Sequence, residues 1–183
     1  LETGRVKPTT VIDTAPGSFT ITGVTIHDSH PHGALTVEQV IQVSSNVGTA
    51  KIAMQMPASE MWETFSKAGF GQKPQLQFPG AATGRLRPYK TWKPIEQATM
   101  SYGHGISVSL IQVARSYMIF ARNGEMIPLS FQKVTQPPQP QRVVSEKTAT
   151  QMREMLELVV GDGDLDEEDM RSLDAAEDTS DLP

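Results

Sequence analysis

The distribution of charge divides this chain at Gly161. Residues 161–183 contain ten acidic residues and one basic residue, whereas residues 1–160 contain eleven acidic and fifteen basic residues. The final segment therefore carries a net charge of about −9 and the rest of the chain about +4. Because like charges repel and the final segment has few large apolar side chains to bury, we expect it to be a solvated, disordered tail. The part of the chain that can fold is predicted to be residues 1–160.

Composition limits what this part can be. Hydrophobic residues make up 38% of the 183 residues, which suffices for the core of one domain, and the chain has no cysteine. Thiolate catalysis and cysteine-ligated zinc are therefore excluded. The cations form no Lys/Arg run, so we expect no nucleic-acid partner. No segment approaches the roughly 18 apolar residues of a membrane span, and the first residues do not resemble a signal peptide. Because the chain begins at Leu1, we expect it to be part of a longer protein.

Turn-forming residues divide the first half of the chain into short segments. β-Branched and aromatic residues predict strands in a two- or three-stranded ribbon, at residues 11–13, 19–22 and 24–26. Apolar residues at helical spacing then predict three helices, over residues 37–43, 47–56 and 59–67. Thr36 followed by Gln39 has the pattern of a capping box at the first of these helices. Gly69 suits the left-handed residue that ends the third.

The second half alternates loops with two longer helical patterns. The Pro- and Gly-rich segment 71–93 is predicted to be mostly loop. The longest helix is predicted to begin at Ser107 or Ser109 and to end at Arg122, with its core face formed by Leu110, Val113, Ala114, Tyr117, Met118 and Ala121. A strand over 127–135 and an extended linker over 136–141 are expected next. Ser145 is predicted to cap a last helix, whose apolar face comprises Met152, Met155, Leu156 and Val159.

Residues that commonly bind metals occur in two places, and neither fits a metal site. His27, His30 and His32 lie within six residues of one another, in a segment that also holds proline and glycine. Since Asp28 is the one carboxylate beside them, we interpret them as surface histidines of a loop. Acidic residues alternate from Asp162 as in an EF-hand loop, but the glycine and the final glutamate of that loop are missing. We therefore expect no metal and no cofactor.

The strongest signal is the block Ser44-Ser45-Asn46-Val47-Gly48, which lies between two predicted helices. A similar turn could simply connect the helices, because serine and asparagine readily bond to exposed backbone groups. Three further blocks accompany it, at 13–17 (Asp-Thr-Ala-Pro-Gly), 70–71 (Phe-Gly) and 101–105 (Ser-Tyr-Gly-His-Gly). On these blocks the sequence resembles the transpeptidase domain of class B penicillin-binding proteins, and most closely the division-specific peptidoglycan transpeptidases. The resemblance covers nearly all of residues 1–160 and none of the tail.

The resemblance implies a fold. Members of this family have the α/β (α+β) fold of penicillin-binding protein transpeptidases and β-lactamases, in which helices pack on both faces of an antiparallel sheet. This chain should supply mainly the helical lobe and a few short strands. Residues 1–160 would then be a partial transpeptidase domain, and residues 161–183 an acidic tail that does not match the family.

The resemblance also implies roles for particular residues. Three motifs meet in the family's active site: Ser-x-x-Lys with the nucleophilic serine, Ser-x-Asn, and Lys-Thr-Gly. By resemblance, Ser44 would relay a proton to the departing amine, and Asn46 would bind the peptide and orient the catalytic lysine. The resemblance places Ser45, Tyr102 and Gly103 among the substrate-binding residues. The implied partners are the peptidoglycan stem peptide, β-lactam antibiotics and cell-division proteins, at the periplasmic face of the bacterial inner membrane.

Two of the three motifs have no suitable match in this sequence. Ser-x-x-Lys occurs once, at Ser130–Lys133, but after Ser-x-Asn and in a segment predicted to be a strand, whereas the family's nucleophile precedes Ser-x-Asn and begins a helix. Lys-Thr-Gly is absent, and the nearest sequences are at 90–92 and 147–149. We therefore predict a central fragment of the domain that, alone, neither crosslinks peptides nor binds penicillin covalently. The alternatives are a noncatalytic interaction module and an inactive fragment with impaired folding.

Overall fold

The strands of the first 36 residues form two separate antiparallel pairs. The computed structural model describes residues 1–74, 76, 80–136 and 138–161. Strand β2 (Ser18–Ile21) pairs with β3 (Val24–His27) as a hairpin, as predicted. Strand β1 (Val11–Asp13) pairs instead with β4 (Ala34–Thr36), which the sequence did not indicate. Of the predicted two- or three-stranded ribbon, the two-stranded form is therefore observed. The three-stranded form is wrong, because β4 rather than the neighbouring hairpin pairs with the backbone of β1.

Six α-helices and one 3-10 helix make up most of the remaining described residues: α1 (Val37–Gln42), α2 (Asn46–Ala53), α3 (Ala58–Lys67), η1 (Tyr89–Thr91), α4 (Pro94–Met100), α5 (Leu110–Ala121) and α6 (Glu146–Gly161). The capping box of α1 is confirmed, since the Gln39 N–H donates to Thr36 Oγ1 at 3.3 Å and the Thr36 N–H donates to Gln39 Oε1 at 2.9 Å. Gly69 has φ +89° after α3, as predicted. The mixture of helices with a few short strands agrees with the expected helical lobe.

The region around α5 differs from the prediction in three ways. Strand β5 (Glu125–Met126) pairs with β6 (Gln141–Arg142), and no strand forms among residues 127–135, where Pro128 lacks the N–H that a strand would donate. The longest described helix is α6, with 16 residues against 12 in α5. The core face predicted for α5 is wrong in part, because Gln112 and Ile119 are its buried residues. Of the six residues predicted, Val113 and Met118 are half-buried and the other four are exposed.

The last helix begins as predicted and is only partly buried. The Thr148 N–H donates to Ser145 Oγ at 3.2 Å, which confirms Ser145 as the cap of α6. Met155 is buried against α1, whereas Val159 is exposed. The tail was expected over 161–183, but Gly161 is the last residue of α6. Residues 162–183, including the alternating acidic residues from Asp162, lie outside the described residues.

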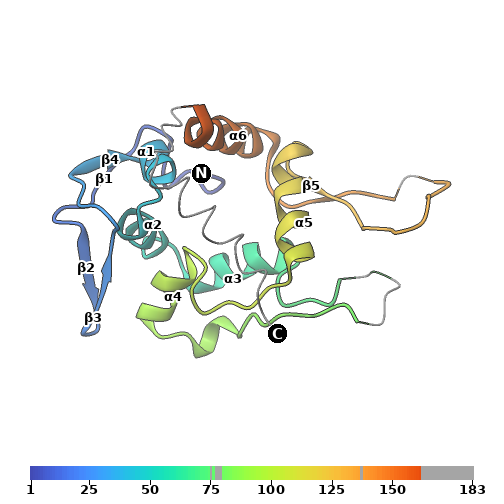
Figure 1. Cartoon of the computed structure of the whole chain (residues 1–183), viewed down its shortest axis with the longest axis horizontal. Helices are drawn as coiled ribbons and strands as arrows, with labels where there is room; N and C mark the ends of the chain where they lie inside the picture. The colour runs from blue at the N-terminus through green and yellow to red at the C-terminus, as the bar shows by residue number, and fades with distance from the viewer. Residues whose placement is uncertain (75, 77–79, 137, 162–183) are drawn as a thin grey trace, which may run out of the picture.

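Helix α2 lies between α1, α4 and the β2–β3 hairpin (Figure 1), and its residues contribute to three of the small clusters that form the core. Val47 and Ala50 pack against the hairpin residues Ile21 and Ile26 and against α4. Ala53, at the end of α2, packs with α3. A separate cluster beneath β1 and β4 joins α1 to α6, and another joins α5 to β5. The position of α2 therefore depends on segments from the whole first hundred residues.

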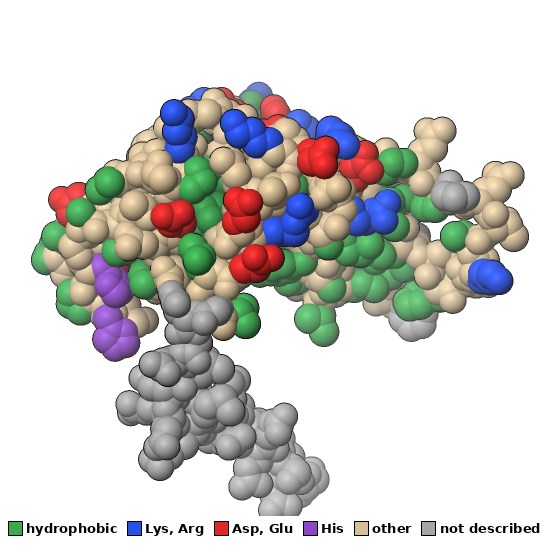
Figure 2. Space-filling model, turned by 90° about the horizontal axis from the view of Figure 1, so that it is seen from above, with side chains coloured by type: hydrophobic (Ala, Val, Ile, Leu, Met, Phe, Trp, Pro, Cys, Tyr) green, Lys and Arg blue, Asp and Glu red, His purple; other side chains and the backbone are tan. Residues whose placement is uncertain are grey.

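Charged residues of both signs are intermixed on the face of the molecule that Figure 2 shows, with apolar side chains among them. The prediction of no nucleic-acid partner rests on the scattered cations in the sequence. Among the described residues, no helix is both long and apolar enough to cross a membrane.

Candidate functional site

The turn between α1 and α2 holds Ser44 in an uncommon backbone conformation. Ser44 has φ +53°, in the left-handed region that usually takes glycine. Its N–H donates to Ile41 O at 3.1 Å, and the Ser45 N–H donates to Val40 O at 3.0 Å. These two bonds are the Schellman pattern that ends many helices with a left-handed residue. Ser44 is exposed, so its hydroxyl lies at the surface where a ligand can reach it.

Ser45 is buried and is the N-cap residue of α2. It is 1% exposed, and its Oγ accepts the Gly48 N–H at 2.9 Å as the cap of the helix. The same hydroxyl donates to Asp28 Oδ2 at 2.7 Å, while Asp28 Oδ1 accepts the Val47 N–H at 2.8 Å. The Ser45 hydroxyl therefore donates one hydrogen bond and accepts another within the protein. Its role as a substrate contact stays a prediction.

Asn46 is half-buried at the first position of α2. Its side-chain Nδ2 donates to His27 O at 3.2 Å, so the amide is held by the last residue of β3. Ser44 and Asn46 thus flank the buried Ser45 on a turn whose backbone is fixed on both sides. A turn fixed in this way can present a hydroxyl and an amide to a substrate with little ordering cost.

Close packing of α1 against α2 explains the glycine of the block. A Cβ atom at Gly48 would lie 2.6 and 2.8 Å from the two methyl carbons of Val40, which is fully buried. Any larger residue would have to push the two helices apart. Gly48 therefore serves the packing of the turn rather than its chemistry.

Lys51 ties the strands to the other end of α2. Its Nζ donates to Asp13 O at 2.6 Å and lies 5.4 Å from the centre of the Phe19 ring. Sequence reasoning did not identify Lys51 or Asp28 as supports of the site. Neither has a motif spacing that would reveal it, because the contacts join residues 17 to 38 positions apart.

Tyr102 and Gly103 follow α4, whose neighbour is α2. Tyr102 packs against the cluster that contains Val47, Ala50 and Ala98, and its burial raises the pKa of its phenol. Gly103 has φ +94° and its surroundings are open. The structure thus brings Tyr102 against the cluster to which α2 contributes, although direct contact with a substrate stays a prediction for both residues.

The sequences that resemble the two missing motifs lie in unsuitable places. Ser130 is in an exposed loop, where its Oγ donates to Gln132 O at 2.8 Å, and it neither begins a helix nor belongs to the expected strand. Lys90 and Thr91 belong to η1, and Lys147 and Thr148 to the first turn of α6. None of the three segments therefore has the local structure that the missing motifs require.

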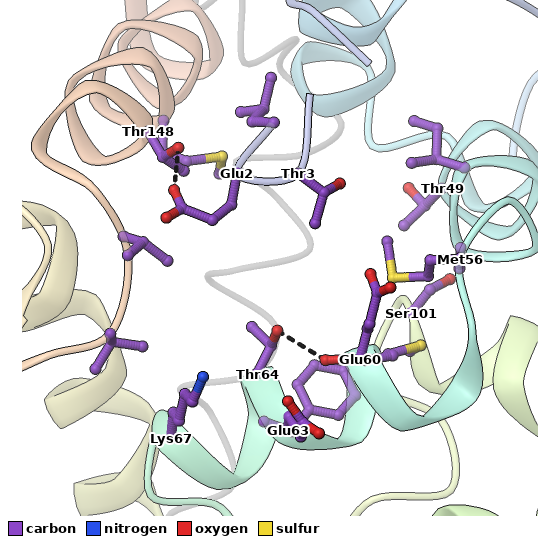
Figure 3. Close-up of a pocket in the computed structure, with 18 of the residues that line it drawn as sticks. Glu2, Thr3, Thr49, Met56, Glu60, Glu63, Thr64, Lys67, Ser101 and Thr148 are labelled. Atoms are coloured by element: carbon purple, nitrogen blue, oxygen red, sulfur yellow. Dashed lines mark hydrogen bonds between the residues drawn. The ribbon is translucent and has the colours of Figure 1, made fainter. Parts of the chain in front are cut away.

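A cavity of about 530 Å³ runs beside α2 (Figure 3). Its apolar lining comes from α2, α3, α5, α6 and neighbouring segments, and includes Ile52, Ala53, Met56, Met61, Phe65, Phe120 and Met152. Asn46, Thr49 and Ala53 share one face of α2 by helical spacing, and the last two line the cavity together with Met56, which follows the helix. The cavity therefore extends along the helix face that begins at the candidate motif.

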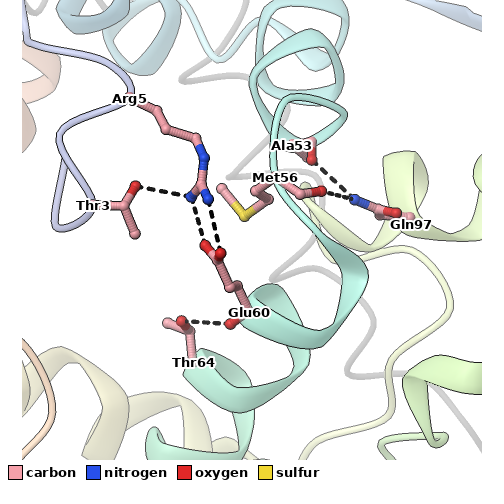
Figure 4. A network of polar contacts seen from close by, with 7 residues as sticks. All are labelled: Thr3, Arg5, Ala53, Met56, Glu60, Thr64 and Gln97. Atoms are coloured by element: carbon pink, nitrogen blue, oxygen red, sulfur yellow. Dashed lines mark hydrogen bonds and ion pairs between the residues drawn. The ribbon is translucent and has the colours of Figure 1, made fainter.

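Polar contacts hold the rim of this cavity (Figure 4). The Arg5 guanidinium makes two hydrogen bonds to the Glu60 carboxylate, and these bonds lower the pKa of Glu60. The Gln97 Nε2 donates to Ala53 O at 3.0 Å and to Met56 O at 2.8 Å, which satisfies carbonyls at the end of α2. Both networks fix the elements around the cavity rather than supply a reactive group.

The described residues contain no group of three histidine, aspartate or glutamate side chains that could hold a metal ion. His27 and His30 are exposed, as expected for surface histidines, and His32 is half-buried.

Comparison with known proteins identifies the family. The family model described as "Penicillin binding protein transpeptidase domain" matches residues 1–172. The peptidoglycan D,D-transpeptidase FtsI of Escherichia coli K12 is 36% identical over 166 residues, which cover 89% of this chain and 28% of FtsI. The chain belongs to the penicillin-binding protein transpeptidase family, and the resemblance to class B members is confirmed.

Solved structures share the fold. The transpeptidase domain of penicillin-binding protein 3 from Burkholderia pseudomallei is 51% identical with a TM-score of 0.84, over 87% of this chain and 49% of that one. Penicillin-binding protein 3 from Mycobacterium tuberculosis, solved with aztreonam, is 31% identical with a TM-score of 0.79, over 87% and 38%. The chain spans 26% to 38% of the length of the curated relatives that it matches.

Proposed function

We propose that this chain supplies the Ser-x-Asn wall of the active site of a peptidoglycan D,D-transpeptidase. In this reaction a serine attacks the carbonyl between two D-alanines, the terminal D-alanine leaves as the amine, and a second stem peptide takes the acyl group. The observation that carries the proposal is the Ser44–Asn46 turn, which exposes Ser44 while Ser45 is buried and hydrogen-bonded. Family membership supplies the reaction class.

Each residue of the wall has a distinct role in this proposal. The Ser44 hydroxyl passes a proton to the departing amine, because an amine leaves far more readily once protonated. The Asn46 amide binds the peptide and orients the lysine of Ser-x-x-Lys. Tyr102 and Gly103 border the substrate, and Ser45 stabilises the turn that presents its neighbours.

The partners and location in this proposal follow the relatives. The M. tuberculosis protein was solved with aztreonam, so the whole protein to which this chain corresponds is proposed to bind β-lactams as well as the stem peptide. The similarity to FtsI leads us to propose cell-division proteins as partners and the periplasmic face of the inner membrane as its location.

We further propose that the chain alone forms no acyl-enzyme, because the described residues offer no serine with a lysine one helical turn later. Incubation with a fluorescent penicillin, followed by denaturing gel electrophoresis, tests this. We expect no more label than on the heat-denatured chain, with E. coli FtsI as the positive control. A stable adduct on this chain, mapped to a serine by peptide mass spectrometry, would contradict the proposal.

A chimera tests the role of the wall directly. The matching segment of E. coli FtsI is replaced by residues 1–160 of this chain, and the second-order rate of acylation by the fluorescent penicillin is measured. Ser44→Ala and Asn46→Ala should each lower this rate about 100-fold, the usual scale for losing a positioned proton carrier or dipole. Ser29→Ala, at an exposed loop position, is the matched control and should leave it unchanged. Folded chimeras whose rates do not differ would contradict the assigned roles.

The cavity beside α2 supports a second candidate, a noncatalytic interaction module. Its lining is mostly apolar and it follows a helix face, so it would receive an apolar helical segment of another chain. Titration with an amphipathic leucine-rich helical peptide would test this by methyl NMR. The methyl signals of Met56, Met61 and Met152 should shift, and that of Met126, in a different cluster, should not. Equal shifts at all four methyls, or none, would contradict this candidate.

A further inference from the structure

The side chain of Asp28 is hydrogen-bonded to the turn between α1 and α2, although no sequence motif links this residue to the turn. It directly follows β3, is half-buried, and its N–H donates to Gly17 O at 3.0 Å, which fixes its own backbone. Its two carboxylate oxygens then bind two different groups of the turn. Oδ2 accepts the Ser45 hydroxyl at 2.7 Å, and Oδ1 accepts the Val47 N–H at 2.8 Å.

The carboxylate also lies where a helix favours negative charge. Val47 is the second residue of α2, and its N–H is one of the groups that a helix leaves unpaired at its start. The neighbouring residue continues the attachment, since His27 O accepts the Asn46 side chain. Residues 27 and 28 therefore hold three consecutive residues of the turn, from 45 to 47.

The backbone conformation of Ser44 is one that such contacts can stabilise. It occupies the left-handed position after α1 at which a glycine is usual, and a serine there is less stable. A strained backbone persists only where its surroundings fix it, and such positions are common at functional sites. Ser44 is joined directly to Ser45, whose side chain Asp28 holds.

We propose that Asp28 is a positioning residue, which locks the turn through Ser45 and Val47 and so keeps Ser44 in the left-handed conformation. The hairpin of β2 and β3 then acts as the rigid support of the turn. This inference rests on the proposed function in one respect, since that function explains why Ser44 has to be held. The inference itself concerns the conformation of the turn and not the reaction.

A double-mutant cycle on the chain itself tests the lock. Ser44→Gly should lower the equilibrium constant of unfolding about fivefold when Asp28 is present, because glycine removes the left-handed strain. After Asp28→Ala, Ser44 can relax, and the same substitution should change that constant less than twofold. An equal fivefold effect in both backgrounds would overturn the proposal, because α1 alone would then be holding Ser44.

Thr22 is the matched control. It is also a non-glycine residue at positive φ, +49°, but it lies exposed at the far end of the hairpin. Thr22→Gly should have the same effect with and without Asp28. If Thr22→Gly and Ser44→Gly both depended on Asp28, Asp28 would be stabilising the hairpin in general, and the proposal would fail.

A second variant and a local measurement keep the test valid if Asp28→Ala does not fold. Asp28→Asn preserves size but cannot accept at both positions, so we expect the Ser44 Cα and Cβ chemical shifts to move away from left-handed values while those of Thr22 stay fixed. Unchanged Ser44 shifts in a folded variant would overturn the lock. Acylation of the chimera tests the proposed function separately, because neither the cycle nor the shifts involve penicillin.

Discussion

Helices α2 and α5 are both rich in apolar residues, yet the structure buries a larger share of those in α2. Helix α2 buries Val47, Ala50 and Ala53 among several segments. Helix α5 leaves Leu110 84% exposed and Tyr117 56% exposed. Its main contacts are with α6 and β5, and it packs through Ile119 and a buried glutamine. An apolar stripe therefore fixes a helix only where other elements surround it.

The largest effect on the free energy of unfolding should come from replacing Gln112, the buried polar residue of α5. The Gln112 Nε2 donates to Gly69 O at 3.2 Å, and to Gln72 O and Thr83 O at 2.9 Å. Gln112→Ala would leave these carbonyls without their donor, so we expect the free energy of unfolding to fall by about 3 kcal/mol in urea denaturation. Gln132→Ala, in an exposed loop, is the control and should change it by less than about 0.5 kcal/mol. Equal effects would mean that α5 is not anchored by Gln112.

The corresponding test of α2 concerns its packing. Gly48→Ala should lower the free energy of unfolding by about 2 kcal/mol, because the new methyl meets the buried Val40. Gly33→Ala is the control, since a Cβ there meets nothing within 4 Å. The double variant with Val40→Ala and Gly48→Ala should lose less free energy of unfolding than the sum of the two single variants, because the smaller side chain at position 40 makes room for the new methyl. Strict additivity would show that the two helices can separate without cost.

Helix α6 contacts both α1 and α5, and its start is held by Glu2. Burial alone would raise the pKa of Glu2, but hydrogen bonds from Thr148 and Ser145 outweigh it, so the pKa is lowered. A pKa that is lower in the folded chain means that ionised Glu2 stabilises the fold. This stabilisation is present at pH values above 4.5, the ordinary pKa of a glutamate, and is lost as the pH falls through the lower pKa of the folded chain.

Glu2→Gln should therefore lower the free energy of unfolding by about 1 kcal/mol at pH 7, the usual scale of a helix cap. The difference from the unaltered chain should shrink as the pH is taken from 7 to below 4, measured by thermal melts. Glu154→Gln, at an exposed position of the same helix, is the control and should show little difference at either pH. A difference at Glu2 that is constant with pH would rule out its charge as the cause.

The smallest effect should be at the exposed face of α5. Leu110→Gln should change the free energy of unfolding by less than about 0.5 kcal/mol, because the side chain already faces solvent. Ile119→Val, on the buried side of the same helix, should cost about 1 kcal/mol. If Leu110→Gln proved the more costly of the two, α5 would be packed on the face that the sequence pattern indicated.

Local signals in the sequence predicted local structure well. The capping box at Thr36, the cap at Ser145 and the glycine after α3 were each predicted and confirmed, because such features depend on residues within one turn of the chain. Helix α4 received no prediction, although Pro94 at its first position is a usual start. The strand expected over 127–135 failed because a strand needs a partner, which the sequence pattern does not supply.

The candidate site divides in the same way. The Ser44–Asn46 turn could be read from its motif, since family resemblance preserves short blocks. Asp28 could not, because nothing in the sequence links residue 28 to residues 45 and 47. Gln112 could not be predicted either, because its burial depends on hydrogen bonds to carbonyls that are distant in sequence.

The sequence by itself determined the family of this protein, the bounds of most helices to within a few residues, and the position of the Ser-x-Asn block. These depend on chemical identity and on backbone preferences over a few residues. The tertiary structure alone decided that β1 pairs with β4, that α5 buries its glutamine, and that Asp28 holds the turn. Those outcomes depend on which distant groups can satisfy one another once the chain is folded, and that is a property of the whole packing.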